Sequence, residues 1–203
     1  MALLVLAATL LPTRADGQAP ADSVIYHVAP QSRFEVLTGR AGLLAFAGHE
    51  HLIRARSFTG TVVFFPDRPE RSRVDIRVLA ESLEVLTPPD TAEIRKVTET
   101  MRTRVLRVAE HPEIRLRSSA VTVTPSGVQV LAALTLGGET RSVVVDLTVR
   151  RSADTLRASG RFSAKQTEFG ITPYAGGPGG TVKVADRVDF TIDVIAARRG
   201  AAP

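Results

Sequence analysis

Apolar and polar residues alternate along much of the chain, most regularly in its last third, from Gly127 to Ala196. Residues 128–136 and 143–149 carry their apolar side chains on one phase, and Gly137-Gly138 lies between them. A period of two is typical of a strand with one buried face, and the glycine pair supplies the positive φ of a tight hairpin. A chain of such hairpins stacks two sheets or closes into a barrel, and a barrel of moderate size can hold an apolar ligand.

The same alternation predicts further strands earlier in the chain and after the hairpin, separated by Pro- and Gly-containing turns. They are expected at residues 24–29, 32–38, 48–54, 58–65, 74–80, 113–117, 121–124, 156–164 and 182–194. Asp186 interrupts the apolar phase of the last strand. This break indicates either a β-bulge or an inward carboxylate that pairs with an arginine or with the polar end of a ligand.

The period changes between residues 90 and 110, where apolar residues recur every three or four positions. Asp90 follows two prolines and can cap a helix, with Glu93 completing a box-like start. The pattern predicts one amphipathic helix, which ends near His111-Pro112 and packs on the barrel. Its apolar stripe is Ile94, Val97, Met101, Val105 and Val108.

Composition narrows the class of protein. The 203 residues suffice for one domain with a sizeable core. Lys and Arg number 26 against 21 Asp and Glu, a net charge of +5, but no dense basic run indicates nucleic-acid binding. The absence of cysteine excludes disulfides, thiolate metal sites and cysteine nucleophiles.

The amino-terminal segment has the form of a secretory signal. Residues 2–11 are apolar except for Thr9 and too few to span a membrane, and small residues follow at positions where a signal peptidase could cut. We expect a signal peptide over residues 1–21, a barrel domain over 22–197 and a disordered tail over 198–203. No transmembrane segment is expected in the mature chain, which we place in the periplasm or outside the cell.

Several motifs, taken in order, resemble the YceI-like family of bacterial polyisoprenoid-binding proteins. They are Tyr26-His27-Val28-Ala29-Pro30, Phe58-Thr59-Gly60-Thr61-Val62, His111-Pro112-Glu113-Ile114, Leu134-Thr135-Leu136-Gly137-Gly138, Phe169-Gly170-Ile171 and Asp186-Arg187-Val188. The resemblance implies a mainly β fold, a single antiparallel lipocalin-like barrel of about eight strands. It also implies a non-catalytic protein whose partner is an isoprenoid lipid or a quinone, without another cofactor; homodimer formation stays open.

The strand phases indicate which side chains would contact the hydrocarbon chain of such a ligand. The expected ligand-binding residues are Phe34, Val36, Phe64, Ile76, Val78, Leu116, Val130, Leu134, Val145, Phe162 and Phe190, with His49 and His51 at the polar end. Aromatic residues make up 5% of the chain and tryptophan is absent, so aliphatic side chains would form most of the wall.

His49 and His51 support an alternative function. Two residues apart on a strand, their imidazoles share a face and can approach one metal ion. The alternatives are therefore a headgroup contact, a metal-binding protein or metal-assisted enzyme, and a purely structural pair. A third hypothesis is an envelope protein whose barrel binds another protein. No residue pattern assembles a nucleophile.

Overall fold

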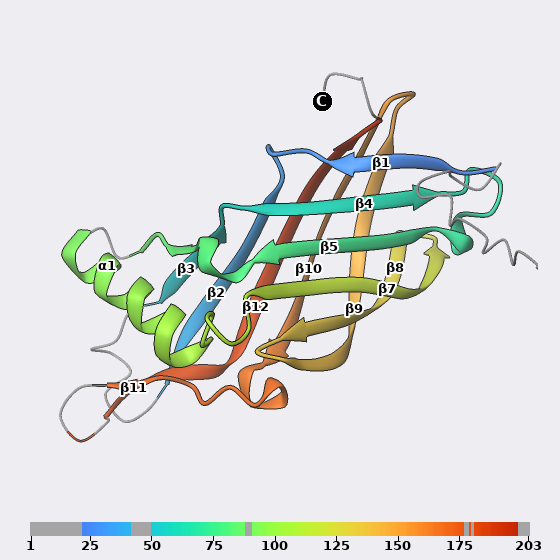
Figure 1. Cartoon of the computed structure of the whole chain (residues 1–203). Helices are drawn as coiled ribbons and strands as arrows, with labels where there is room; N and C mark the ends of the chain where they lie inside the picture. Colours follow the sequence, from blue (N-terminus) through green and yellow to red (C-terminus); the bar gives the residue numbers. More distant parts are fainter. Residues whose placement is uncertain (1–21, 42–49, 88–90, 177–178, 180, 199–203) are drawn as a thin grey trace, which may run out of the picture.

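Eight antiparallel strands close into a barrel, as the resemblance implied (Figure 1). The computed structural model describes residues 22–41, 50–87, 91–176, 179 and 181–198, so the expected signal peptide lies outside the described residues. Closure occurs where His27 of the first strand faces Ala197 of the last. In order round the barrel the strands are β1 (Val24–Val28), β4 (Phe58–Phe64), β5 (Arg73–Leu79), β7 (Glu113–Thr124), β8 (Gly127–Leu136), β9 (Glu139–Arg151), β10 (Thr155–Lys165) and β12 (Val182–Ala197).

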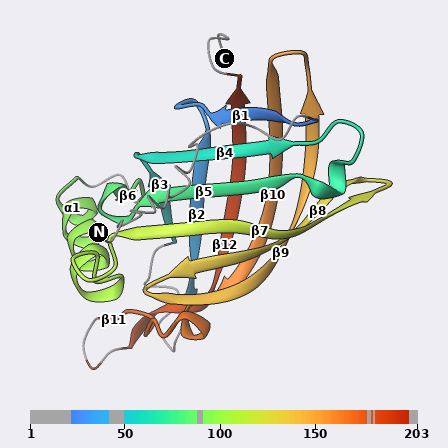
Figure 2. The same cartoon turned by 45° about the vertical axis from the view of Figure 1, so that its right-hand side comes forward.

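Three further strands extend the sheet beyond the closure, from the free part of β12 (Figure 2). They are β2 (Arg33–Ala41), β3 (His51–Ala55) and β6 (Leu83–Val85). Phe190 of β12 faces Val36 of β2, which in turn faces Ile53 of β3. A two-residue strand, β11 (Ala175–Gly176), also pairs with β12.

The hairpin between β8 and β9 confirms the strongest local signal of the sequence. Gly137 and Gly138 have φ angles of 59° and 84°, in the region that side chains with a Cβ disfavour. The strands flank this turn with Leu136 facing Glu139. The alternation on either side then places one apolar phase inside the barrel.

The interruption at Asp186 is a β-bulge, the first of the two alternatives. The register between β12 and β2 shifts between Val184 and Val188. The Asp186 carboxylate accepts hydrogen bonds from the backbone N–H and the hydroxyl of Thr167, at 2.9 and 2.8 Å. These bonds hold the pKa of Asp186 below its ordinary value. The carboxylate therefore anchors the short helix η5 (Gln166–Phe169), and the bulge lets it leave the apolar phase.

The helix is shorter than predicted. α1 (Thr91–Thr100) continues into one π-helical turn, η4 (Met101–Val105), and does not reach residue 110. The amide of Leu106 donates to the Met101 carbonyl, and Arg107 follows with a φ of 47°, which a right-handed helix cannot include. The predicted apolar stripe is confirmed at Met101, which is buried, while Asp90 lies outside the described residues.

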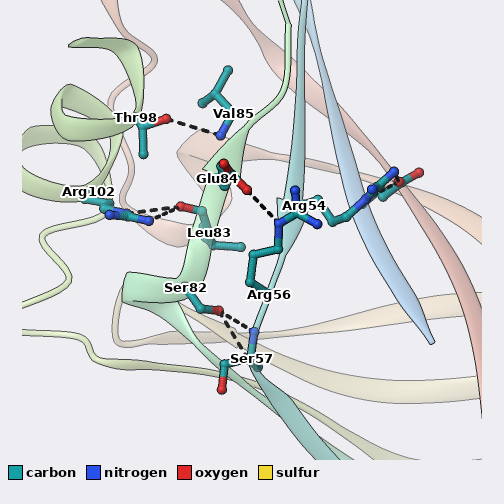
Figure 3. Close-up of polar contacts among 10 residues, drawn as sticks. Arg54, Arg56, Ser57, Ser82, Leu83, Glu84, Val85, Thr98 and Arg102 are labelled. Carbon is teal, nitrogen blue, oxygen red and sulfur yellow. Dashed lines mark hydrogen bonds and ion pairs between the residues drawn. The ribbon is translucent and has the colours of Figure 1, made fainter. Parts of the chain in front are cut away.

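Helix α1 covers the outer edge of β6, the last strand of the sheet (Figure 3). The Thr98 hydroxyl accepts a hydrogen bond from the Val85 amide at 3.2 Å. The Arg102 guanidinium donates two bonds, at 3.0 and 2.8 Å, to the Leu83 carbonyl. The helix thus satisfies backbone groups that an uncovered strand edge would expose.

The remaining short helices are η2 (Pro69–Arg71) and η3 (Ala80–Ser82). Within the described ranges, none of the helices combines the length and the apolar character needed to cross a membrane.

Candidate functional site

An apolar cavity of about 100 Å³ lies inside the barrel. Among the described residues that form its wall, none has a titratable side chain, and Ser72 alone has a polar one. The lining residues are Val62, Phe64, Pro69, Ser72, Val74, Ile76, Leu116, Val121, Val128, Val130, Val145, Leu147, Val149, Leu156, Ala158, Ile192 and Val194. The predicted aliphatic wall is therefore confirmed. Such a hollow offers water too few partners and suits a hydrocarbon group.

The cavity lies toward one end of the barrel. Phe64 is the last residue of β4, and Pro69 and Ser72 belong to the connection between β4 and β5, which is opposite the end where α1 lies (Figure 1). The buried Met101, Phe169 and Ile171 belong to the main core cluster and do not line the cavity. The cavity thus occupies only part of the apolar interior.

Five predicted ligand contacts line the cavity: Phe64, Ile76, Leu116, Val130 and Val145. Two others, Val78 and Leu134, lie buried in the main core cluster and do not line the cavity. The remaining four are half-buried, and Phe34, Phe162 and Phe190 among them pack against the core cluster. Val36 faces Phe190 across β2 and β12. The structure therefore brings together only part of the predicted set.

Sequence reasoning missed most of the aliphatic wall, including Val62, Val74, Leu147, Leu156 and Val194. Each of these residues follows the apolar phase of its strand, so the signal was present. The phase identifies the inward face of a strand but not the depth at which that face meets an empty space. That depth depends on the tilt of the strands and on which side chains fill the barrel at each position along its axis.

Apolar surface continues along β12 and β10 beyond the cavity. Ile192 lines the cavity, and Phe190, two residues earlier on β12, faces the same way and stays half-buried. Phe162 of β10 is its direct cross-strand neighbour, and the two rings stack. Phe34 and Phe58 meet edge to face nearby in the fold, with centroids 4.8 Å apart. A long apolar ligand thus has further surface beyond the cavity.

Tyr26 is the largest side chain with no exposed surface in the barrel, on the inward phase of β1 opposite Val62. Among the described residues, its hydroxyl is the one buried side-chain polar atom without a hydrogen-bond partner. An unpaired hydroxyl in an apolar core is unfavourable. No sequence pattern indicates this feature, because hydrogen-bond pairing of the hydroxyl depends on neighbours from other strands.

His51 lies on the inward face of the sheet extension, half-buried and opposite Thr38. Its Nδ1 lies 2.9 Å from the carbonyl oxygen of Thr87. Since a carbonyl can only accept, Nδ1 carries the hydrogen and Nε2 is the nitrogen left for another contact. His49, the other member of the predicted pair, lies outside the described residues.

The metal alternative finds no support in the described part of the chain. There, no group of three or more His, Asp or Glu side chains is placed to hold a metal ion. Of the other histidines, His27 lies on β1, and His111 lies after η4, where it contacts the Arg107 guanidinium at 3.4 Å.

Comparison with known proteins identifies the type of domain. A family model for the YceI-like domain matches residues 30–196. No curated protein matches the chain. Among solved structures, BcnA of Burkholderia cenocepacia is similar with a TM-score of 0.66 and 17% identity, covering 82% of this chain and 97% of BcnA.

Two further structures share the fold. A polyisoprenoid binding domain from Saccharophagus degradans, implicated in plant cell wall breakdown, has a TM-score of 0.60 and 13% identity, covering 86% of this chain and 98% of that domain. The YCEI protein of Campylobacter jejuni has a TM-score of 0.56 and 13% identity, covering 72% and 84% of the two chains.

Proposed function

The chain belongs to the YceI-like family, and we propose that it binds the hydrocarbon chain of an isoprenoid lipid or quinone inside its barrel. The observation that carries this proposal is the apolar cavity, whose wall offers hydrocarbon contacts and no group suited to catalysis. The similar fold of the polyisoprenoid binding domain from Saccharophagus degradans supports it. The proposed role is that of a non-catalytic carrier.

Hydrophobic transfer supplies the binding energy in this proposal. Each buried methylene contributes about 0.8 kcal/mol, so a chain of many carbons binds firmly without hydrogen bonds. The lining is almost entirely aliphatic, which leaves the identity of the polar end to groups outside the cavity. In this proposal the cavity therefore binds the hydrocarbon tail, and residues outside the cavity bind the headgroup.

The size of the cavity sets a condition on the ligand. An engineered cavity of about 150 Å³ in another protein takes one benzene molecule, so about 100 Å³ holds roughly one isoprene unit. A longer chain must extend along the partly exposed inward surface at Phe34, Phe162 and Phe190, with these side chains moving to admit it. We propose that this movement accompanies binding.

We also propose a periplasmic or secreted location. The apolar run at residues 2–11 and the small residues that follow it support this placement, because they have the form of a signal peptide. Fractionation of cells that express the full chain, with mass determination of the mature protein, tests the location. A mature protein that retains residues 1–21 in the cytosolic fraction would contradict it.

The ligand proposal is tested by native mass spectrometry of the purified protein, followed by lipid extraction and identification. We expect a bound species with an isoprenoid chain, or saturable binding of added isoprenoids of increasing length by the emptied protein. Affinity should rise with the number of isoprene units until the ligand covers all of the apolar surface that is accessible inside the barrel. Recovery of no lipid, together with no binding of any added isoprenoid, would overturn the proposal.

A further inference from the structure

The tip of the β9–β10 hairpin carries two arginines that face each other directly. Arg150 of β9 is the cross-strand neighbour of Arg157 of β10, and both side chains are exposed. Within the described part of the chain, neither guanidinium has a carboxylate oxygen within 4.0 Å. Like charges directly opposite each other on neighbouring strands repel. Anions supplied from outside the chain would therefore stabilise this pair.

A third arginine lies on the inner side of the same hairpin. Arg151 of β9 is opposite Leu156, which lines the cavity. Its guanidinium lies 5.1 Å from the centre of the ring of Phe64, another residue of the cavity wall. Since successive side chains of a strand point to opposite faces, positive charge lies on both sides of the barrel wall at the edge of the cavity.

One carboxylate offsets this charge within the hairpin tip. Residues 150–157 together with Arg198 contain four arginines and a single acidic residue, Asp154. The Asp154 carboxylate lies 3.9 Å from the Arg198 guanidinium, at the end of β12. We call the four arginines Arg150, Arg151, Arg157 and Arg198 the basic rim.

The β4–β5 connection, at the same end of the barrel, is closer to neutral. Residues 66–73 hold three arginines and two acidic residues, and Arg68 also forms an ion pair with Asp22. The excess of positive charge at the cavity end is therefore concentrated on the side of the β9–β10 hairpin.

An apolar side chain of the barrel interior is exposed at this end as well. Val123 of β7 is opposite Val128, which lines the cavity, yet the Val123 side chain is 55% exposed. An inward-phase valine with this exposure shows that the apolar interior meets solvent here. Exposed apolar side chains together with basic ones suit the surface of an anionic membrane, where negative headgroups cover hydrocarbon.

From these observations we propose that the cavity end of the barrel docks on the surface of an anionic lipid bilayer, with the basic rim against the headgroups and Val123 toward the hydrocarbon. The choice of a bilayer over other anionic partners rests on the proposed function, because a carrier of lipid tails needs access to the membrane that holds them. The four guanidinium groups are spread over both sides of the barrel wall, which suits a layer of many headgroups better than one bound ion.

Sedimentation with sucrose-loaded vesicles tests the docking, with the protein purified in its mature form. The wild type should bind vesicles of phosphatidylglycerol and phosphatidylcholine in equal parts about tenfold or more tightly than vesicles of phosphatidylcholine alone, and less so as the salt concentration rises. R150Q/R157Q should lose about tenfold or more in affinity for the anionic vesicles, since each arginine near such a surface contributes roughly a fivefold factor.

The matched control is R95Q/R104Q, which removes two exposed arginines from α1 and η4, at the other end of the barrel, and changes the net charge equally (Figure 1). It should bind the anionic vesicles as the wild type does. Circular dichroism verifies that both double variants are folded. Equal loss in the two variants would show nonspecific attraction to a basic protein and would overturn the inference, as would equal affinity of the wild type for the two kinds of vesicle.

The orientation on the membrane is measured with the wild-type arginines in place. The chain contains no tryptophan, so V123W introduces a single fluorescent reporter at the cavity end. V144W places the reporter on the outer face of β9, where Val144 is 50% exposed. The emission of V123W should shift to shorter wavelength when anionic vesicles are added, and that of V144W should not. An equal or larger shift in V144W, or no shift in either variant, would overturn the proposed docking face.

Three outcomes separate this inference from the proposed function and from other anionic partners. The vesicles contain no isoprenoid, so isoprenoid binding without a preference for anionic vesicles ends the docking inference alone. A preference for anionic vesicles in a protein that binds no isoprenoid supports the docking and ends the proposed function alone. Poly-L-glutamate serves as a competitor, and displacement of the protein from the vesicles at equal charge concentration would assign the basic rim to a soluble polyanion and overturn the inference.

Discussion

The aromatic rings of Phe162 and Phe190 stack across the β10–β12 pair, with their centroids 4.5 Å apart and their planes 2° from parallel. Both side chains lie on the inward phase of their strands, and Phe190 is two residues before the cavity residue Ile192. Each ring is half-buried, so the pair forms part of the apolar surface onto which a long ligand would extend. Removing either ring should affect both stability and the room inside the barrel.

A double-mutant cycle on this pair should reveal a direct coupling. F162L and F190L should each destabilise the fold by about 1–2 kcal/mol, and the coupling should be about 0.5–1.5 kcal/mol in favour of the stacked pair. Urea unfolding of the wild type, both single variants and the double variant measures these quantities. Additivity of the two single changes would show that the stacking contributes nothing beyond burial.

Filling the cavity should abolish hydrocarbon binding. V145F places a ring where Val145 lines the cavity, and we expect at least a tenfold loss of isoprenoid affinity with a stability penalty of about 1–3 kcal/mol. V144F is the matched control, since Val144 is the next residue and is 50% exposed. Ligand titration, with circular dichroism to verify folding, gives the comparison. Equal affinities of the two variants would place the ligand elsewhere.

The hydroxyl of Thr98 should protect the edge of β6. T98V removes the acceptor of the Val85 amide, so that amide should exchange with solvent roughly tenfold faster or more. T103V is the control, because the Thr103 hydroxyl donates to the Glu99 carbonyl on the exposed side of the helix. Amide hydrogen exchange followed by NMR reads the effect residue by residue. Unchanged exchange at Val85 would mean that helix packing alone covers the edge.

The Asp75–Arg115 pair should contribute to the loss of stability in acid. The hydrogen bonds from Arg115 lower the pKa of Asp75 in the folded chain, so the pair stabilises the fold above about pH 4, the ordinary range of the carboxyl. That contribution is lost as the pH falls through the lowered pKa. D75N and R115Q should each flatten the acid limb of a plot of unfolding free energy against pH. A limb as steep as in the wild type would exclude this pair as its source.

Replacing Tyr26 by phenylalanine should leave the protein as stable as the wild type or up to about 1 kcal/mol more stable. The Tyr26 hydroxyl is buried without a partner, and its removal relieves an unfavourable desolvation. Y174F is the control at an exposed tyrosine. Thermal and urea unfolding provide the measurement. A loss of more than 1 kcal/mol would reveal a bound water or ligand on the hydroxyl.

Most of the barrel could be predicted from the chain itself because each strand carries a period of two. The β8–β9 hairpin followed from Gly137-Gly138, and the bulge at Asp186 from one polar residue on an apolar phase. The helix end and β6 could not be predicted as well. Arg107 at positive φ has no sequence signal, and three residues are too few to show a period.

The candidate site was predicted in part. Phe64, Ile76 and Val130, predicted as ligand contacts, line the cavity because their phase is inward. Val78 and Leu134 share that phase and are buried, but they do not line the cavity. The phase of a strand therefore predicts which residues face inward and not which of them border an empty space.

The order of apolar and polar residues by itself determined the strands, their inward faces and the membership of a barrel family, because these depend on neighbours in the chain. Tertiary structure alone decided which of the inward residues border the cavity and which buried hydroxyl stays unpaired. Those properties depend on the tilt and register of strands far apart in sequence. Two residues that are two positions apart on a strand face the same way, yet one can border the cavity while the other is packed in the core.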